Sequence, residues 1–566
     1  MIQEISQFIK QALKLDYLPN VEVPKEEGFG HYSTNLAIIE AKKLARPAPE
    51  LAHELIAQLK EADKNGLFEK IETAGPGFIN FTLASDFLSK KLSEALSTGD
   101  SFGKTKSQKG EKIIIEYTDP NPFKAFHIGH LMTNAIGEAL ARNLEWAGAK
   151  VKRANYQGDV GMHVAKSIYG MIQLNNETPD KNASLKEKVA FLGKAYALGA
   201  KEYELEETKK EIEELNKKIY QQSNPAINKL YKLGRKWSLD YFEQIYKKLG
   251  TKFDYYFFES NTAKFGEKLV REWLQKDVFN ESNGAIVFDG EKYGLHTRVF
   301  INSQGLPTYE AKELGLAKLK YKKCKYSRSI VITGNEIKAY FQVLLKAMSF
   351  VFPKLAERTE HFPHGMLRLP EGKMSSRTGE VIEAETLLNE VKSAVEQRMQ
   401  DAHFPPEEKK EISNAVSVSA VKYSILRAAA KNDIVFDLES SISLSGASGP
   451  YIQYSYARLA QVLKKGAFAK SANFVLLVNK EAKDLAAKLI QFPDIVDFSA
   501  KTLATNHIAT YAYQLAKLTN RFYEEVPILK EEDKEIKAAK LALAKISATT
   551  LKNSLEILGI EAPGRI

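Results

Sequence analysis

Two histidines three residues apart, in the tetrapeptide His127-Ile128-Gly129-His130, have types and spacing that suggest chemistry. They open a segment with helical apolar spacing, so both lie on one face of its first turn. A helix start offers unpaired N–H groups and the positive end of the dipole, which favour phosphate. Gly129 has no side chain and would let a flat ring approach the backbone. The tetrapeptide therefore suggests a nucleotide site; a helix start with two solvent-facing histidines is the alternative.

A second candidate lies at 372–379, where glycines flank a short stretch with a lysine, an arginine and two serines. Glycine hinges, hydroxyl donors and positive charge are what a mobile phosphate clamp needs. Alone, such a stretch is an ordinary surface loop, and its meaning depends on the first motif. The residues singled out in it are Lys373, Met374, Ser375 and Arg377.

The elements around the first motif predict a parallel α/β sheet. An apolar run with β-branched residues at 112–118 predicts a buried strand, and a proline-bearing loop leads from it to His127. The helical segment ends at Gly148, and 151–156 begins another strand. Two further strand signals stand at 285–288 and 329–333. This order predicts a Rossmann-like, doubly wound parallel sheet.

The length of 566 residues is too great for one compact core and favours three or four domains. A Lys/Ser/Gly-rich stretch at 101–112 and a proline-bearing break at 404–409 suggest linkers. The predicted parts are an N-terminal α+β domain (1–105), a Rossmann-like domain (106–380) with insertions near 170–250 and 260–305, a helical connecting region (381–440) and a C-terminal helical domain (441–566).

Composition narrows the class of protein. The formal net charge of +10, from 81 basic and 71 acidic residues, makes a polyanionic partner plausible. No run of 18 apolar residues occurs and the N-terminus resembles an amphipathic helix, so we expect a cytoplasmic protein without membrane contact. The lone Cys324 excludes internal disulfides, and we expect neither a zinc site nor another protein-bound metal.

Together, His-Ile-Gly-His and Lys-Met-Ser-Ser-Arg resemble the HIGH and KMSKS signatures of class I aminoacyl-tRNA synthetases. The resemblance implies that an amino-acid carboxylate attacks the α-phosphate of ATP, with Mg²⁺, and that pyrophosphate leaves. Positioning and charge neutralisation would carry this step. The implied catalytic residues are Lys124, His127, His130, Lys373, Ser375 and Arg377. The implied ATP contacts are His127, Gly129, His130, Gly334, Asn335, Lys373 and Met374.

The residues before the first motif resemble arginyl-tRNA synthetases in particular. Asn121 and Lys124 stand six and three residues ahead of His127, as in that family. The family's second signature often lacks its second lysine, and the upstream lysine is thought to compensate. This chain has Ser376 at that place and keeps Lys124. The resemblance therefore implies a catalytic role for Lys124.

A pocket for arginine should offer carboxylates, because the guanidinium is planar and permanently charged. Asn121, Glu259 after an expected strand, and Tyr309 and Glu313 in the segment Thr-Tyr-x-x-x-Glu match the family's arginine-binding positions. The family usually has Asp at 313, and Glu is one methylene longer. Without the resemblance, both glutamates would be taken for surface charges.

The flanking segments resemble the family's RNA-binding parts. Residues 30–55 and 74–81 are similar to its N-terminal domain, which contacts the tRNA elbow. Residues 449–459 and 507–526 are similar to its anticodon-binding helices, where aromatic side chains can stack on unpaired bases. The candidate tRNA contacts are Gln453, Tyr454 and Tyr511. Tyr511 and Tyr513 cannot share a helix face, so at least one should be core.

The resemblance implies an arginine–tRNA ligase whose partners are L-arginine, ATP and tRNA(Arg), acting as a monomer. One alternative is an inactive RNA-binding paralogue, which would have lost phosphate-binding residues that are present here. Another is a class I synthetase for a different amino acid. A cysteinyl enzyme would need more cysteines for zinc, and a glutamyl enzyme would want cations where Glu259 and Glu313 stand.

Overall fold

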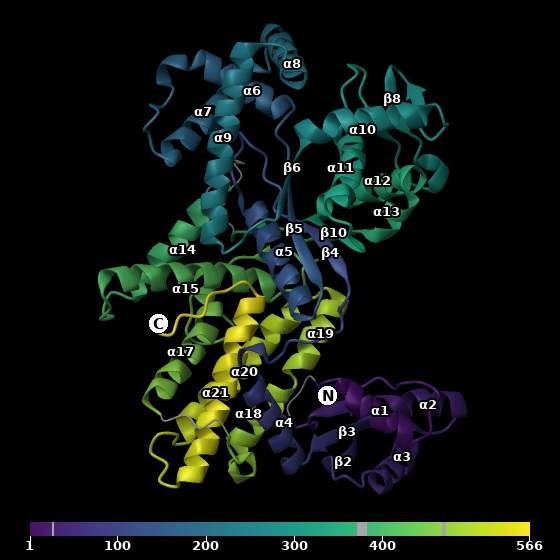
Figure 1. The fold of residues 1–566 in the computed structure, drawn as a ribbon, viewed down its shortest axis with the longest axis vertical. Helices are drawn as coiled ribbons and strands as arrows, with labels where there is room; N and C mark the ends of the chain where they lie inside the picture. The colour runs from purple at the N-terminus through teal and green to yellow at the C-terminus, as the bar shows by residue number, and fades with distance from the viewer. Residues whose placement is uncertain (25–27, 371–381, 467–470) are drawn as a thin grey trace. The chain divides into compact units, whose positions relative to one another are not determined.

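The computed structural model describes residues 1–24, 28–370, 382–466 and 471–566. The chain forms two compact units (Figure 1). Unit 1 contains residues 1–107, 443–557 and 561–566, and unit 2 contains residues 108–442 and 558–560. Among the helices of the described residues, none has the length and apolar character needed to cross a membrane.

Unit 2 is built on a parallel sheet of five strands. In spatial order they are β11 (Thr359–His364), β10 (Arg328–Gly334), β4 (Lys112–Glu116), β5 (Lys150–Gln157) and β6 (Tyr255–Phe258). Ile115 of β4 pairs with Ile330 and Arg153, so β4 is central, and its three isoleucines are wholly buried. The chain winds outward from β4 on one side, then returns to β10 on the other. The predicted doubly wound sheet is confirmed, with its switch point between β4 and β10.

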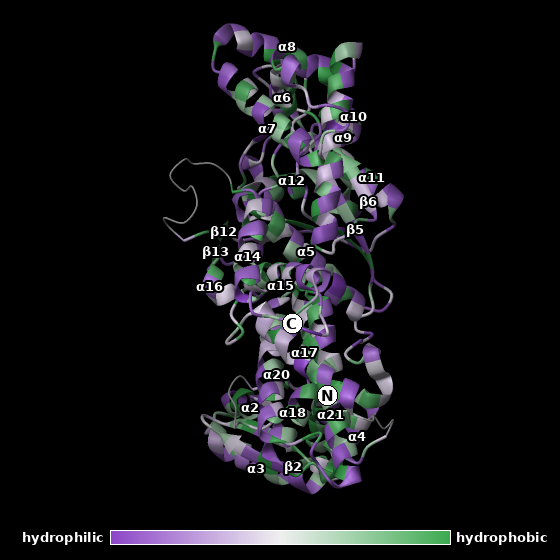
Figure 2. Ribbon diagram, turned by 90° about the vertical axis from the view of Figure 1, so that its left-hand side faces the viewer, coloured by the Kyte–Doolittle hydropathy of each residue, from purple (hydrophilic) through white to green (hydrophobic). Residues whose placement is uncertain are grey.

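Helices flank and extend this sheet (Figure 1). They are α5 (Ile128–Trp146), α6 (Met162–Gln173), α7 (Leu185–Glu202), α8 (Glu206–Gln221), α9 (Pro225–Lys248), α10 (Glu259–Leu274), α11 (Tyr309–Lys323), α12 (Lys338–Val351), α13 (Pro353–Arg358), α14 (Ala384–Arg398), α15 (Pro406–Leu426) and α16 (Leu438–Ser441). A short parallel pair, β12 (Leu367–Arg368) and β13 (Ile434–Val435), precedes α16. Between β5 and β6, helices α6 to α9 form the first insertion, whose α8 ribbon is largely hydrophilic (Figure 2).

The strand expected at 285–288 forms, but outside the parallel sheet. It is β8 (Ala285–Phe288), the middle strand of an antiparallel sheet with β7 (Asn280–Ser282) and β9 (Arg298–Ile301). Asn283 and Gly284 connect β7 to β8 with φ of 49° and 76°. Two left-handed residues in a two-residue loop produce a tight hairpin turn, which holds β8 against β7.

Unit 1 combines a small sheet with a set of helices. Its antiparallel sheet has the order β1 (Tyr32–Thr34), β3 (Phe78–Leu83) and β2 (Phe68–Ala74). Its helices are α1 (Ile2–Ala12), α2 (Leu36–Leu44), α3 (Ala48–Ala62), α4 (Ser85–Thr98), α17 (Gly449–Lys465), α18 (Lys480–Ile490), α19 (Phe492–Thr502), α20 (Asn506–Glu525) and α21 (Lys534–Ile557). Asp494 on α19 accepts hydrogen bonds from the Tyr32 hydroxyl and the Met1 ammonium, each 3.1 Å long. These bonds tie the N-terminal segments to the C-terminal helices.

Candidate active site

The loop between β4 and α5, residues 117–127, lies at the switch point of the sheet and has a strained backbone. Thr118, Asp119 and Phe123 have φ of 81°, 46° and 67°, a region that non-glycine residues seldom adopt. Buried contacts hold these conformations. The Thr118 hydroxyl accepts a 3.0 Å hydrogen bond from the Asn134 amide, and the Phe123 N–H donates a 2.9 Å bond to the Ser238 hydroxyl. Such over-determined strain is typical of functional sites.

His127 and His130 cap the start of α5 reciprocally. Nδ1 of His127 accepts from the N–H groups of Gly129 (3.1 Å) and His130 (3.4 Å). Nδ1 of His130 accepts from the His127 N–H (3.2 Å). Burial, reinforced by the positive charge of Lys124, lowers the pKa of His127, and burial lowers that of His130 further. Both rings are therefore neutral near pH 7, with Nε2–H as the remaining donor.

The absence of a side chain at Gly129 leaves room for the His127 ring. A Cβ added there would lie 2.9 Å from two atoms of the His127 ring, so a side chain would push that ring away. The glycine is thus required by the cap in this structure, in addition to the open approach that we expected for adenine.

The chain returns to His127 after the second motif. The Ile128 N–H donates to the Ile382 carbonyl (3.0 Å), and the Ala384 N–H donates to the Phe126 carbonyl (2.9 Å). These bonds flank a bridge between His127 and Glu383. Residues 382–384 are therefore fixed against the first motif. Lys373, Met374, Ser375 and Arg377 lie outside the described residues.

The end of β10 supplies the other side of the switch point. Gly334 ends this strand, Asn335 follows exposed, and the Glu336 carboxylate folds back so closely on Gly334 that a Cβ would collide with it. Glu336 also lies near enough to His127 to oppose the lowering of its pKa. Glu336 is a residue of this site that the sequence interpretation missed.

A second cluster forms at the ends of β5 and β6. The Asn121 side-chain oxygen accepts a 3.0 Å hydrogen bond from the Gly158 N–H. A Cβ added to Gly158 would lie 2.5 Å from that oxygen and 3.2 Å from Oε1 of Glu259. Oε2 of Glu259 binds the ammonium of Lys312 at 2.6 Å. The side chains of Asn121 and Glu259 thus meet at Gly158, and Lys312 is a partner that the sequence interpretation missed.

Further acidic groups lie near this cluster. Burial and the nearby Glu116 carboxylate raise the pKa of Glu313 on α11 to about 8. The same two causes raise the pKa of Asp119 well above its ordinary value, with a further contribution from Glu313. Glu116 itself is paired with the buried Lys320 at 2.9 Å. A cation bound beside Glu313 and Asp119 would oppose these shifts and favour the ionised carboxylates.

Lys124 lies within electrostatic reach of both clusters. Partial desolvation and the charge of Lys166 lower its pKa, while Glu259 opposes that shift. Its charge in turn lowers the pKa of His127 and His130. Tyr309, the first residue of α11, is 57% exposed, with the Lys312 ammonium 5.0 Å from its ring centre.

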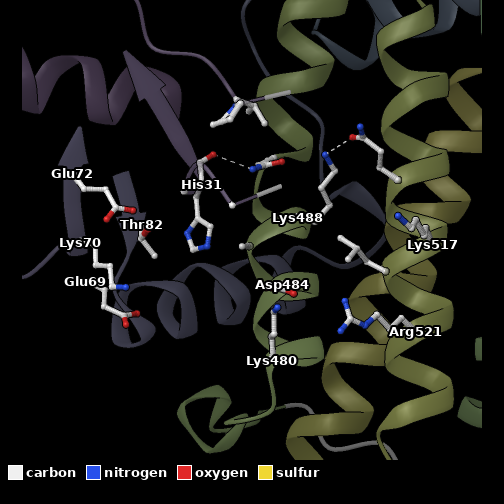
Figure 3. A pocket seen from close by; sticks show the side chains of 18 of the residues that line it. His31, Glu69, Lys70, Glu72, Thr82, Lys480, Asp484, Lys488, Lys517 and Arg521 are labelled. Atoms are coloured by element: carbon white, nitrogen blue, oxygen red, sulfur yellow. Dashed lines mark hydrogen bonds between the residues drawn. The ribbon is translucent and has the colours of Figure 1, made fainter. Parts of the chain in front are cut away.

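Unit 1 contains a separate groove of about 610 Å³ between its small sheet and helices α18 and α20 (Figure 3). In Figure 3 the side chains of the sheet lie opposite those of the two helices. The charged groups that line this unit 1 groove are Lys70, Lys480, Lys488, Lys517, Arg521, Glu69, Glu72 and Asp484. Tyr513 also lines the groove, and the Gln491 amide bridges to the His31 carbonyl (3.1 Å).

Family models agree with this arrangement. The model described as "tRNA synthetases class I (R), catalytic domain" matches residues 91–438, more than half of the chain. The chain belongs to the class I arginyl-tRNA synthetases. The "Arginyl tRNA synthetase N terminal domain" matches residues 1–83 and the "DALR anticodon binding domain" matches residues 452–566.

Individual members of the arginyl-tRNA synthetase family match this chain over almost its full length. The arginine–tRNA ligase of Clostridium perfringens is 30% identical over 98% of both chains. Among solved structures, the arginyl-tRNA synthetase of Thermus thermophilus has a TM-score of 0.83 at 22% identity and covers 100% of both chains. That of Plasmodium falciparum has a TM-score of 0.80 at 20% identity and covers 100% of this chain and 99% of its own. The family and the fold expected from the sequence are confirmed.

The predicted tRNA contacts in this family member need correction at two positions. Tyr511 is 1% exposed, stacks on Phe492 and donates a 3.0 Å hydrogen bond to the Lys488 carbonyl. Gln453 is wholly buried and donates to the Glu561 carbonyl (2.7 Å). Neither side chain offers a surface to RNA in this fold. Tyr454 stays partly exposed, and Tyr513 is the tyrosine of α20 that lines the groove.

Proposed function

We propose that this chain is an arginine–tRNA ligase. It joins L-arginine to ATP, releasing pyrophosphate, and then transfers the arginyl group to the 3′ end of tRNA(Arg), releasing AMP. The proposal rests above all on one arrangement. Carboxylates suited to a guanidinium, Glu259 and Glu313, share the carboxyl edge of the sheet with the neutral donors His127 and His130. Open α/β sheets bind ligands at this edge.

In this proposal ATP occupies the switch point. Nε2–H of His127 and His130 and the first N–H groups of α5 would bind phosphate oxygens, and Gly334 and Asn335 would contact the nucleoside. ATP would bring Mg²⁺ bound to its phosphates, so no protein-bound metal is needed. Lys124 would add positive charge near the α-phosphate, where charge develops as the arginine carboxylate attacks.

Arginine would lie between the phosphate donors and the α10–α11 pair. Asn121, Glu259 and Tyr309 would orient it, and Glu313 would balance its charge. Lys373, Met374, Ser375 and Arg377 would complete the phosphate contacts. Their tether supports this assignment, because residues 382–384 are bonded to the first motif.

For tRNA, we assign the unit 1 groove and the exposed side of α17. Five basic side chains outnumber three acidic ones in the lining of the groove, which favours a polyanion. Tyr513 and Tyr454 offer aromatic faces for unpaired bases. The proposed enzyme acts as a monomer in the cytoplasm.

The decisive experiment is aminoacylation of total tRNA with each of the twenty amino acids. Charging with arginine alone is expected. Charging with another amino acid instead would establish a different synthetase, and tRNA binding without charging would establish an inactive paralogue. Pyrophosphate exchange with and without tRNA tests whether arginine activation requires tRNA, and equal rates would refute that requirement.

A further inference from the structure

The Glu259 carboxylate, assigned above to the guanidinium of arginine, already has a cation of the protein's own beside it. Nζ of Lys312 lies 2.6 Å from Oε2, and the two side chains are 5% and 4% exposed. No other ion pair with Glu259 occurs in the described part of the chain. The arginine site therefore contains a buried lysine–glutamate pair before any substrate arrives.

Close packing of two helices fixes this pair. Glu259 is the first residue of α10 and Lys312 is in the first turns of α11. A side chain at Gly266 would collide with the Ala311 carbonyl, and a Cβ at Gly315 would lie 2.5 Å from the Thr262 carbonyl. Because the backbones touch at these glycines, neither helix can shift without breaking the contact. The lysine ammonium thus has little freedom relative to the carboxylate.

Aromatic rings surround the rest of the ammonium. Its Nζ lies 5.0 Å from the centre of the Tyr309 ring and 5.6 Å from that of Tyr220. Both rings stabilise a cation through their faces. Breaking a buried ion pair is costly because each partner is left without its counter-charge. An incoming guanidinium that displaced Lys312 would pair with Glu259 but leave the buried ammonium without a counter-charge, so displacement is unfavourable.

Lys312 contacts only one of the two carboxylate oxygens of Glu259. Within the described residues no hydrogen bond reaches Oε1 of Glu259, and this oxygen faces the bare α-carbon of Gly158. The Asn121 side-chain oxygen borders the same point. Glu259 thus has one oxygen paired with Lys312 and one without a hydrogen bond among the described residues, and the second lies toward Gly158 and Asn121.

We propose that Lys312 is a positioning residue of the arginine site, which permanently holds Oε2 of Glu259 and thereby aims Oε1 at one edge of the substrate guanidinium. The inference rests on the proposed arginine specificity. Because the charge of Glu259 is already balanced by Lys312, Glu259 orients the guanidinium, and Glu313 is left to balance its charge. The lysine stays in place when arginine binds.

The effect of Lys312 on ionisation makes this role measurable. Burial raises the pKa of Glu259, and Lys312 opposes the rise. Without the lysine, the pKa of Glu259 moves higher still, and the carboxylate is lost at less acidic pH. The acidic limb of the arginine KM profile should therefore shift toward higher pH.

The test compares Lys312→Met, Lys312→Arg and wild-type enzyme by pyrophosphate exchange in the presence of tRNA. Loss of an oriented, charge-assisted contact should raise the arginine KM of Lys312→Met at least about tenfold, with the ATP KM unchanged. Its pH limb should shift as above, and Lys312→Arg should restore most of both properties. Lys540→Met is the matched control, because Lys540 is also a buried, paired lysine (4% exposed) but belongs to unit 1.

Three results would overturn the proposal. One is a Lys312→Met enzyme with the wild-type arginine KM and pH profile. Another is tighter arginine binding by Lys312→Met, measured by calorimetry, which would show that the lysine competes with substrate. The third is an equal rise of both KM values without a pH shift, which indicates a structural role only. If wild-type enzyme fails to activate arginine, the proposed function itself fails, independently of Lys312.

Discussion

The imidazole rings of His127 and His130 stack with their centroids 3.6 Å apart and their planes inclined by 21°. Each Nδ1 accepts a backbone N–H, so each ring carries its proton on Nε2. Two imidazolium rings at this distance would repel each other, and the lowered pKa of both residues agrees with neutral rings. The pair therefore acts through hydrogen bonds rather than through charge, and Lys124 supplies the positive charge nearby.

The neutral-donor role of His127 predicts that the cap and the catalysis can be separated. His127→Asn keeps an oxygen that can accept the Gly129 N–H but loses Nε2–H. Pyrophosphate exchange should fall about 100-fold to 1000-fold, as for other lost transition-state donors, while the urea unfolding midpoint stays unchanged. His127→Ala should also lose about 1 kcal/mol of stability with the cap. A near-normal rate for His127→Asn would exclude the donor role.

Arginine binding is predicted to release a proton from Glu313. With a pKa of about 8, this carboxyl is mostly protonated at pH 7, and the guanidinium needs it ionised. Binding should strengthen as pH rises toward 8 and level off above it. Calorimetry at pH 7 in buffers of different ionisation enthalpy should give up to about one proton per arginine. Glu313→Gln should abolish the release; an unchanged release would assign the proton to another group, with Asp119 as the first candidate.

The sequence was most informative about features that depend on residues close together in the chain. The doubly wound sheet and the helix start at His127 follow from strand signals, a proline-bearing loop and two histidines that are close in sequence. Glu259 could be singled out only through the family resemblance, which expects a glutamate after a strand; in the structure it directly follows β6.

Contacts between distant segments could not be predicted in this way. Lys312 meets Glu259 from 53 residues away because two glycine-lined helices touch. Whether Tyr511 or Tyr513 is the buried one depends on how α20 packs, and helical spacing could show only that they differ. Burial of Gln453 likewise depends on the returning C-terminal segment, which its amide contacts.

Gly158 is predicted to tolerate no side chain in a working arginine site. In Gly158→Ala the new methyl would press on the Asn121 oxygen and on Oε1 of Glu259. The arginine KM should rise at least about tenfold, because one oriented polar contact is worth that much, while the ATP KM and the unfolding midpoint change little. Gly193→Ala on α7 is the control, because a Cβ there meets open space. Equal effects of both variants would contradict the prediction.

His163 is predicted to make the enzyme sensitive to acid. Its Nε2–H donates to the Gly158 carbonyl (2.9 Å), and burial lowers its pKa to about 4. Between the ordinary pKa near 6.5 and pH 4, only the unfolded chain takes up this proton, so stability falls as pH decreases. His163→Gln keeps an N–H donor but cannot titrate. Its urea midpoint should therefore decline less than that of wild type from pH 6.5 to 4; parallel declines would contradict this assignment.

Lys124 is predicted to be essential for adenylation and dispensable for folding. Its side chain is exposed, its Nζ lies 5.9 Å from the centre of the Tyr196 ring, and its charge reaches both His127 and Glu259. Lys124→Ala should lower pyrophosphate exchange about 100-fold or more, because a charge aimed at the developing phosphate charge is lost, and should leave the unfolding midpoint unchanged. Lys194→Ala, which removes an exposed lysine of α7 that is paired with Glu177, should retain full activity. Near-normal exchange by Lys124→Ala would remove this lysine from the catalytic set. It would also contradict the expectation that Lys124 compensates for the lysine that Ser376 replaces.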